Sequence, residues 1–336
     1  MAAADAHDAG AVAVAGGAAS VPCVTLNTGH AMPVLGFGTG SSRTPEDLPA
    51  TILHAVRLGY RHLDTASLYG TEPAVGAAVA DALRSGAVAS RGDLFVTSKL
   101  WITDAHAGRV VPALRESLAR LGLDYLDLFL VHWPVAAAAA AGGGGGGREG
   151  RTLVPFDMEG VWRGMEECHR LGLARAIGVS NFSAARMARL LAVAAVPPAV
   201  NQVEANVGWR QEKVREVCAK NGVVVTAFSP LGANGAAWGS SAVMESGVMQ
   251  EIAARRGKTV AQVALRWLHE QGVCFVARSF NKERLKQNME IFDWELSQED
   301  KAMIMQIPQR RACHGEFFVS QDGPYKSLEE LWDGEI

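Results

Sequence analysis

Four polar side chains stand out because they lie at or just beyond the ends of apolar, strand-like runs. Asp64, Lys99 and His132 close three successive runs, and Tyr69 follows Asp64 by five positions. Taken alone, each has a structural explanation: an Asp64–Lys99 ion pair, a core histidine or a tyrosine that caps a loop. A buried charge is costly unless it is paired, however, and four such residues at neighbouring strand ends indicate a functional site.

The chemistry that these residue types could perform is proton transfer to a carbonyl oxygen. A tyrosine hydroxyl has an ordinary pKa of about 10, so it exchanges a proton near neutral pH only beside a cation. Lys99 would supply that cation, Asp64 would hold Lys99, and His132 would orient the carbonyl oxygen. Tyr69 would then act as general acid. Because no side chain donates hydride, the arrangement predicts a nicotinamide cofactor.

A ring of parallel strands would bring these residues together. Eight strand-like runs, most of them rich in Val, Ile, Leu and Phe, are typical of strands buried on both faces. They are residues 35–39, 60–66, 93–99, 126–132, 174–180, 199–205, 223–229 and 272–279. Amphipathic stretches separate them, and several end on glycine, a common helix-terminating signal. Eight such units over about 250 residues predict an α/β fold, the (β/α)8 barrel, with its site at the carboxyl ends of the strands.

An open doubly wound sheet is the alternative fold. It would place G-x-G-x-x-G after the first strand. Here Gly36, Gly38 and Gly40 are followed by Ser41, which does not meet that pattern.

The remaining segments predict one domain with appended parts. Residues 1–20 are interpreted as a disordered tail and 21–336 as a single domain that opens with a hairpin over 23–35. Residues 136–150 have the low-complexity sequence AAAAAAGGGGGGREG, which predicts a flexible loop after the fourth strand. The tail 308–336 is expected to pack over the active-site end of the barrel.

Composition excludes several other functions. Lys and Arg total 32 and Asp and Glu 35, so the net charge of −3 argues against nucleic-acid or membrane-surface binding. The sequence contains no stretch of about 20 apolar residues, the length that would be needed to span a bilayer. The five widely spaced Cys and nine His residues show no disulfide framework or metal-ligand spacing, so no metal is expected. The first 20 residues lack the basic residues of a targeting signal, which predicts a cytoplasmic protein. The protein is also expected to be a monomer.

Several motifs resemble those of the aldo-keto reductases. In chain order they are GYRHLDTASLYGTE (59–72), SKLW (98–101), LVHWP (130–134), GVSNF (178–182), NQVE (201–204), SPLG (229–232) and SFNKERLKQN (279–288). The resemblance runs from about residue 23 to the C-terminus, except over 135–151. It implies the (β/α)8 barrel and NADPH-dependent reduction of a small-molecule carbonyl substrate. It also places Asp64, Tyr69, Lys99 and His132 on the family's catalytic residues, with Tyr69 as general acid.

The resemblance further implies a set of cofactor contacts. Ser180, Asn181 and Gln202 would bind the nicotinamide carboxamide, and Trp209 would stack on its ring. The other implied contacts are Gly38, Thr39 and Asp64 beside the ring, Ser229 and Leu231 at the pyrophosphate, and Phe280, Asn281, Gln287 and Asn288 on the adenosine side.

A phosphate site is expected where the last strand meets the last barrel helix. Arg278 and Ser279 end the strand, and Arg284 lies in the first turns of the helix. Two guanidinium groups at a helix N-terminus suit a dianionic phosphate. The family binds the 2′-phosphate here, which implies NADPH rather than NADH. The family usually has Pro and Lys where this chain has Ala277 and Arg278, but Arg keeps the charge.

The substrate pocket departs from the family in two places. Many members have Trp where this chain has Gly40, which would widen the pocket, and the Ala/Gly run replaces a loop that often shapes it. Trp101 and Trp133, with Tyr69 and His132, are expected to contact the substrate.

Residues 156–183 and 323–336 look most like the grass deoxymugineic acid synthases. These belong to a plant branch of the family with codeinone reductase-like and chalcone reductase-like enzymes. The resemblance implies reduction of the keto group of an oxo-nicotianamine intermediate, whose charges would need partners such as Arg310, Arg311 or His314. The alternatives are a broad-specificity aldehyde or ketone reductase, another specialised-metabolite ketone reductase, and a weakly catalytic binding subunit.

Overall fold

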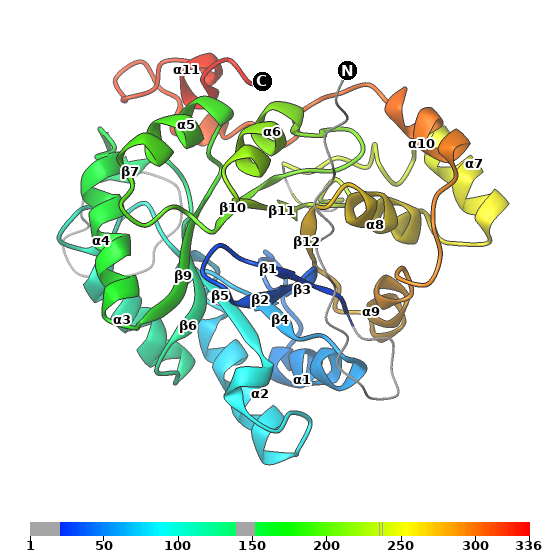
Figure 1. Cartoon of the computed structure of the whole chain (residues 1–336), viewed down its shortest axis with the longest axis horizontal. Helices are drawn as coiled ribbons and strands as arrows, with labels where there is room; N and C mark the ends of the chain where they lie inside the picture. Colours follow the sequence, from blue (N-terminus) through cyan, green and yellow to red (C-terminus); the bar gives the residue numbers. More distant parts are fainter. Residues whose placement is uncertain (1–20, 139–151, 235, 237) are drawn as a thin grey trace, which may run out of the picture.

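A closed barrel of parallel strands forms the centre of the molecule (Figure 1). The computed structural model describes residues 21–138, 152–234, 236 and 238–336. The barrel strands are β3 (Leu35–Gly38), β4 (His62–Asp64), β5 (Phe95–Leu100), β6 (Leu126–Val131), β9 (Ala174–Ser180), β10 (Val200–Glu204), β11 (Val224–Phe228) and β12 (Cys274–Ala277). The strand order is β10-β11-β12-β3-β4-β5-β6-β9, with the ends closed. The predicted (β/α)8 barrel is therefore confirmed, and the open-sheet alternative is wrong.

Helices surround the barrel and cover its outer face (Figure 1). They are α1 (Leu48–Leu58), α2 (Glu72–Arg84), α3 (Val110–Leu121), α4 (Met158–Arg170), α5 (Ala184–Val193), α6 (Glu212–Lys220), α7 (Gly247–Arg256), α8 (Val260–Glu270), α9 (Lys282–Met289), α10 (Gln298–Met305) and α11 (Leu328–Trp332). Their boundaries follow local signals. Asp47 caps α1 by accepting a hydrogen bond from Ala50 N. Gly59 ends the same helix at a φ of 115°, which glycine adopts without a steric penalty.

The register of the strands aims the polar residues into the barrel. Asp64 pairs with Thr97 across β4 and β5. Residues paired in register point to the same side of a sheet, and so do residues two apart on one strand. Asp64 and Lys99 therefore share the inner side, which is why the ends of two different strands can bring their charges into contact.

The opposite end of the barrel is closed by the predicted hairpin. Strands β1 (Cys23–Thr25) and β2 (Ala31–Pro33) pair antiparallel. Met32 is fully buried and packs in one apolar cluster with Phe95 and Leu128, near the starts of β5 and β6. This plug leaves the carboxyl ends of the strands as the open end.

The loop after β6 begins and ends in a short antiparallel stem. Strand β7 (Ala136–Ala137) pairs with β8 (Leu153–Val154), and Ala137 N donates to the carbonyl of Ile102. The prediction of a flexible loop over 136–150 is thus wrong for Ala136 and Ala137, because both make backbone hydrogen bonds and are buried. Positions 139–150, like the predicted N-terminal tail 1–20, lie outside the described residues.

The C-terminal tail lies against the open end of the barrel, as predicted. Short helix η3 (Glu316–Phe318) and α11 belong to this segment. Glu204, which ends β10, accepts hydrogen bonds from Ala312 N and Cys313 N. Ser183 and Ala184, just after β9, bond the carboxylates of Asp333 and Glu335.

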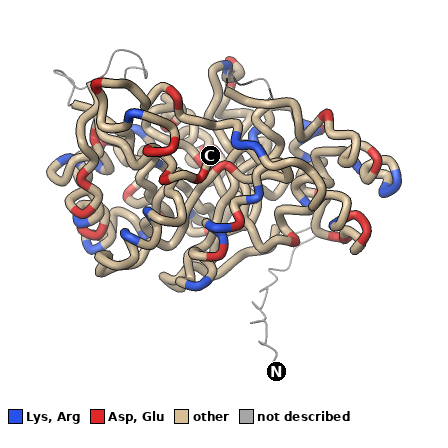
Figure 2. The backbone as a smooth tube through the Cα atoms, turned by 90° about the horizontal axis from the view of Figure 1, so that it is seen from above, with Lys and Arg blue, Asp and Glu red and all other residues tan. Residues whose placement is uncertain are grey.

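Charged residues of both signs are spread over the described chain (Figure 2). Among the helices of the described residues, none is long and apolar enough to cross a membrane.

Candidate active site

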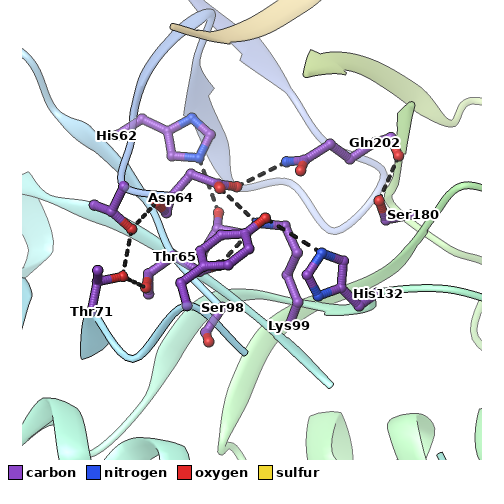
Figure 3. Close-up of polar contacts among 12 residues, drawn as sticks. His62, Asp64, Thr65, Thr71, Ser98, Lys99, His132, Ser180 and Gln202 are labelled. Atoms are coloured by element: carbon purple, nitrogen blue, oxygen red, sulfur yellow. Dashed lines mark hydrogen bonds and ion pairs between the residues drawn. The ribbon is translucent and has the colours of Figure 1, made fainter. Parts of the chain in front are cut away.

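A buried ion pair forms the floor of the site (Figure 3). Lys99 is fully buried, and its Nζ donates to Asp64 Oδ1 at 2.6 Å and to the carbonyl of Thr65 at 2.9 Å. Gln202 Nε2 donates to the other Asp64 oxygen, Oδ2, at 2.9 Å. Because both carboxylate oxygens are bonded, Asp64 is fixed in orientation and holds the ammonium group in one place.

Burial and the neighbouring charges act in opposite directions on Lys99. Burial by itself lowers the pKa of Lys99, but the charge of Asp64 and hydrogen bonds to Asp64 and Tyr69 outweigh it, so the pKa is raised above its usual value. Lys99 is therefore a permanent cation beneath Tyr69 at neutral pH.

Tyr69 lies above this ion pair on the 3-10 turn η1 (Ser67–Tyr69). Its hydroxyl is 3.4 Å from His132 Nε2, and Lys99 Nζ is 5.1 Å from the centre of its ring. A Cβ at Gly40 would come within 3.0 Å of Tyr69 Cε2 and Cζ, so the Tyr69 ring packs closely against the bare glycine and a side chain there would have to displace it. The structure thus brings together the four residues predicted to act as a unit.

His132 is held among aromatic rings at the end of β6. It packs edge-to-face on Tyr69 and Trp101, with ring centres 5.5 and 5.2 Å apart. Trp101 and Trp133 are both almost fully buried. Trp133 packs against Phe318 and Trp332 of the tail, at 4.9 and 5.6 Å between ring centres. The two predicted substrate-contacting tryptophans therefore stiffen the wall around His132.

The ends of β9 and β10 form a set of amide and hydroxyl groups. Ser180 Oγ donates to the carbonyl of Gln202 at 2.7 Å. Asn181 has a φ of 62°, and its Nδ2 donates to the carbonyl of His132 at 2.9 Å. Asn181 Oδ1 is buried and finds no hydrogen-bond partner among the residues that the structure describes. A buried acceptor left open in this way fits the amide N–H of a carboxamide.

Trp209 is placed less favourably for stacking than the sequence suggested. It lies in the loop after β10, and the guanidinium carbon of Arg311 is 4.9 Å from the centre of its ring. Phe228, which sequence reasoning did not single out, ends β11 in register with Glu204. Its half-exposed ring lies edge-on to Trp238 at 6.2 Å between centres. The signal that could have found it is its position, the last residue of a barrel strand before SPLG.

The other residues expected around the ring lie at the ends of β3 and β11. Gly38 pairs with Asp64 in register, and the buried Thr39 hydroxyl donates to the carbonyl of Asp64. Ser229 follows β11 with a φ of 53°, and Leu231 is half-buried two residues later.

The expected phosphate site surrounds the start of α9. Arg278 and Arg284 are both exposed, and Asn281 caps the helix by accepting from Arg284 N at 3.0 Å. Ser279 is buried, Phe280 and Gln287 are half-buried, and Asn288 is buried and hydrogen-bonded to Tyr60. The exposed cations suit a phosphate, whereas Asn288 supports the helix from below.

The three tail residues considered as substrate partners are not equivalent. Arg311 is 2% exposed, with its guanidinium carbon 3.6 Å from the centre of the Trp332 ring, and its Nη2 donates to the carbonyl of Glu335. Burial lowers its pKa to about 10. Arg311 is therefore a structural clamp that a substrate cannot reach. Arg310 is exposed and His314 is half-exposed, so both remain candidates for binding the charged groups of the substrate.

The comparison with known families decides the class of the protein. Residues 34–308 match the description "Aldo/keto reductase family". The chain belongs to this family. The reductase is therefore an NADP-dependent oxidoreductase that acts on carbonyl groups, which confirms the reaction and cofactor predicted from the sequence.

Named relatives of this aldo-keto reductase include plant enzymes. It is 54% identical over 310 residues to deoxymugineic acid synthase 1-D of Triticum aestivum, which covers 92% of this chain and 98% of that protein. It is 51% identical over 318 residues to the 7-acetyl-epi-neemfruitin B aldo-keto reductase of Melia azedarach, covering 94% and 98%. A Bombyx mori aldo-keto reductase solved in complex with NADP has a TM-score of 0.82 at 35% identity, covering 91% of this chain and 99% of that one.

Proposed function

We propose that this reductase converts the keto group of an oxo-nicotianamine intermediate to an alcohol, as a deoxymugineic acid synthase does. The observation that carries the proposal is the 54% identity to the wheat enzyme over nearly its whole length. The arrangement of Asp64, Lys99 and His132 around Tyr69 supports the reaction class, because each of these side chains is within contact distance of the next.

In this proposal, Tyr69 supplies the proton of the reaction. NADPH, when bound, supplies the hydride. The substrate oxygen lies between the hydroxyl of Tyr69 and Nε2 of His132, and these two groups orient it. Tyr69 gives its proton to that oxygen, and the Lys99 ammonium group stabilises the negative charge left on the phenolic oxygen. Asp64 keeps Lys99 charged and in place, so the phenol is prepared before the substrate arrives.

Residues at the carboxyl ends of β9, β10 and β11 are proposed to fix the nicotinamide. Asn181 Oδ1 accepts from the carboxamide, and Ser180 and Gln202 complete its surroundings. Phe228 is the better stacking partner of the ring, because Arg311 lies over Trp209. The aromatic wall with Trp101 and Trp133 then excludes water from the side facing His132.

The substrate assignment is tested by following NADPH oxidation at 340 nm with purified enzyme. The oxo-nicotianamine intermediate is assayed beside a panel of simple aldehydes and ketones. We expect kcat/KM for the intermediate to exceed that for every simple carbonyl by at least about 100-fold, because a site built for several charged groups loses that binding with a small substrate. Comparable kcat/KM values across the panel would refute the assignment.

A second candidate, reduction of a bulky specialised metabolite, is favoured by the similarity to the Melia azedarach enzyme. In the same assay, turnover of such ketones with none of the intermediate would select this candidate. NADPH binding without turnover of any carbonyl would select the binding-subunit alternative.

The phosphate site predicts a specific effect of Arg284→Ala. A hydrogen bond to a charged group contributes about 1.5–3 kcal/mol, so the Kd of NADPH should rise about 10- to 100-fold. The Kd of NADH, which has no 2′-phosphate, should stay the same. Both are measured by quenching of tryptophan fluorescence. The matched control is Lys286→Ala, which removes an exposed charge from the same helix. An equal loss of affinity for both dinucleotides would contradict the assignment.

The subunit state and location are proposed on the sequence alone. We infer a cytoplasmic monomer without a nucleic-acid partner. Light scattering of the purified chain tests the monomer, and a fluorescent fusion tests the location.

A further inference from the structure

The turn that carries Tyr69 is not part of the barrel. Tyr69 ends the three-residue helix η1, in the loop between β4 and α2, whereas Lys99 lies within β5. The distance between the tyrosine ring and the ammonium group therefore depends on what holds this loop against β5. A loop of this kind moves more readily than a strand unless its own groups are anchored.

Two hydrogen bonds anchor the loop to adjacent residues of β5, one from each side of Tyr69. Before the tyrosine, Ser67 Oγ donates to the carbonyl of Lys99 at 3.0 Å. After it, Glu72 Oε1 accepts from Ser98 Oγ at 2.6 Å. Ser98 points to the opposite face of β5 from Lys99 (Figure 3). The chain on each side of Tyr69 is thus bonded to β5, once through the strand's backbone and once through a side chain.

The second anchor is a buried charge that is itself held in place. Glu72 is 1% exposed, and its Oε2 accepts from Arg120 Nε of α3 at 2.6 Å. Its neighbour Thr71 is buried and bonded through its hydroxyl to Thr39 and Thr65, at 2.8 Å each. Every polar atom of the Glu72 carboxylate is therefore used, and the start of α2 cannot shift without breaking a buried hydrogen bond.

We propose that Glu72, through Ser98, is a positioning residue that sets the distance from Tyr69 to Lys99 and so the ease with which the phenol gives up its proton. The proposal rests on the proposed role of Tyr69 as general acid. Nothing in the chemistry requires Glu72 to touch substrate or cofactor. A displacement of about 1 Å can lower a rate by about 100-fold, so a loosened loop should be visible in turnover.

The test compares Ser98→Ala with Ser98→Thr, which keeps a hydroxyl, on any carbonyl that the enzyme reduces. In Ser98→Ala we expect kcat to fall at least about 10-fold and the limb of the kcat–pH profile that reports the phenol to move to higher pH, because the cation is farther away. The Kd of NADPH should not change. Ser98→Thr should restore both kcat and the profile.

A control variant at Asp300 distinguishes the proposed positioning role of Glu72 from a purely structural role. Asp300 is also a buried carboxylate that accepts from arginines, Arg255 and Arg256, but on α10. Asp300→Asn should lower the melting temperature without moving the pH profile. Glu72→Gln should change kcat and the pH profile in the same direction as Ser98→Ala, and if it does not fold, Ser98→Ala alone decides the proposal. A Ser98→Ala enzyme with the wild-type kcat and pH profile would overturn the proposal. Tyr69→Phe, assayed in parallel, distinguishes failure of the positioning proposal from failure of the proposed function. If Tyr69→Phe keeps its turnover, Tyr69 is not the general acid, and the proposed function fails as well.

Discussion

The variant Tyr69→Phe is expected to lose about 10²- to 10⁴-fold in kcat, the range typical of removing a general acid. The phenyl ring keeps its place against His132 and above Lys99, so the packing of the site is preserved. The missing hydroxyl leaves the substrate oxygen without its proton donor. The measurement is steady-state NADPH oxidation with the preferred substrate.

Binding of NADPH provides the control for this variant. The hydroxyl of Tyr69 belongs to the substrate side, so the Kd of NADPH should remain within about twofold of the wild-type value, well under the tenfold that 1.4 kcal/mol represents. A melting temperature close to that of the wild type would show that the fold is intact. Retention of even a tenth of the wild-type kcat would be incompatible with Tyr69 as the proton donor.

The variant Lys99→Met is expected to lose both turnover and stability. It removes the cation beneath the phenol and leaves Asp64 buried with Gln202 and without its charge partner. Removing one member of a buried ion pair costs about 3–5 kcal/mol of unfolding free energy. Denaturant unfolding at neutral pH measures this loss, and kcat should fall at least as far as in Tyr69→Phe.

The stability difference should depend on pH in a defined direction. The pKa of Lys99 is raised in the folded protein, so its contribution is fully present below the unfolded value of about 10.4 and is lost as pH rises through the folded value. The gap between wild type and Lys99→Met should therefore be constant from pH 7 to 9 and narrow above pH 10. Lys220→Met, which removes a lysine paired with Glu216 on the exposed face of α6, should cost no more than about 1 kcal/mol. A gap that widens at high pH would contradict the assigned charge state.

The fold could be predicted from the sequence because its signals are local. Most barrel strands are short apolar runs, and a charged or polar residue lies at or next to the carboxyl end of β4, β5 and β6: Asp64, Lys99 and His132. Counting eight such runs was enough to predict both the barrel and the position of Asp64, Lys99 and His132 on one rim.

Contacts made by the tail and the loops could not be predicted in this way. Arg311 looks like a free cation in the sequence, but Trp332 and Trp209, which are far from it along the chain, enclose its guanidinium group. Ala136 and Ala137 look like low-complexity sequence, but partners at Leu153 and Val154 make them a strand. In both cases the deciding partner is distant, and local composition carries no signal for it.

Closure of the barrel depends on one pair of strands, β12 and β3, which form the seam of the ring. Neighbouring strands of the described barrel follow one another around the ring in chain order, except that β12 pairs with β3. Phe275 and Leu35 face each other there although 240 positions separate them. During folding this pairing has the largest entropic cost and should form last, leaving two unpaired edges exposed until then. Such edges can pair with another copy, so refolding yield should fall as protein concentration rises, and a chaperone that shields the seam should restore it.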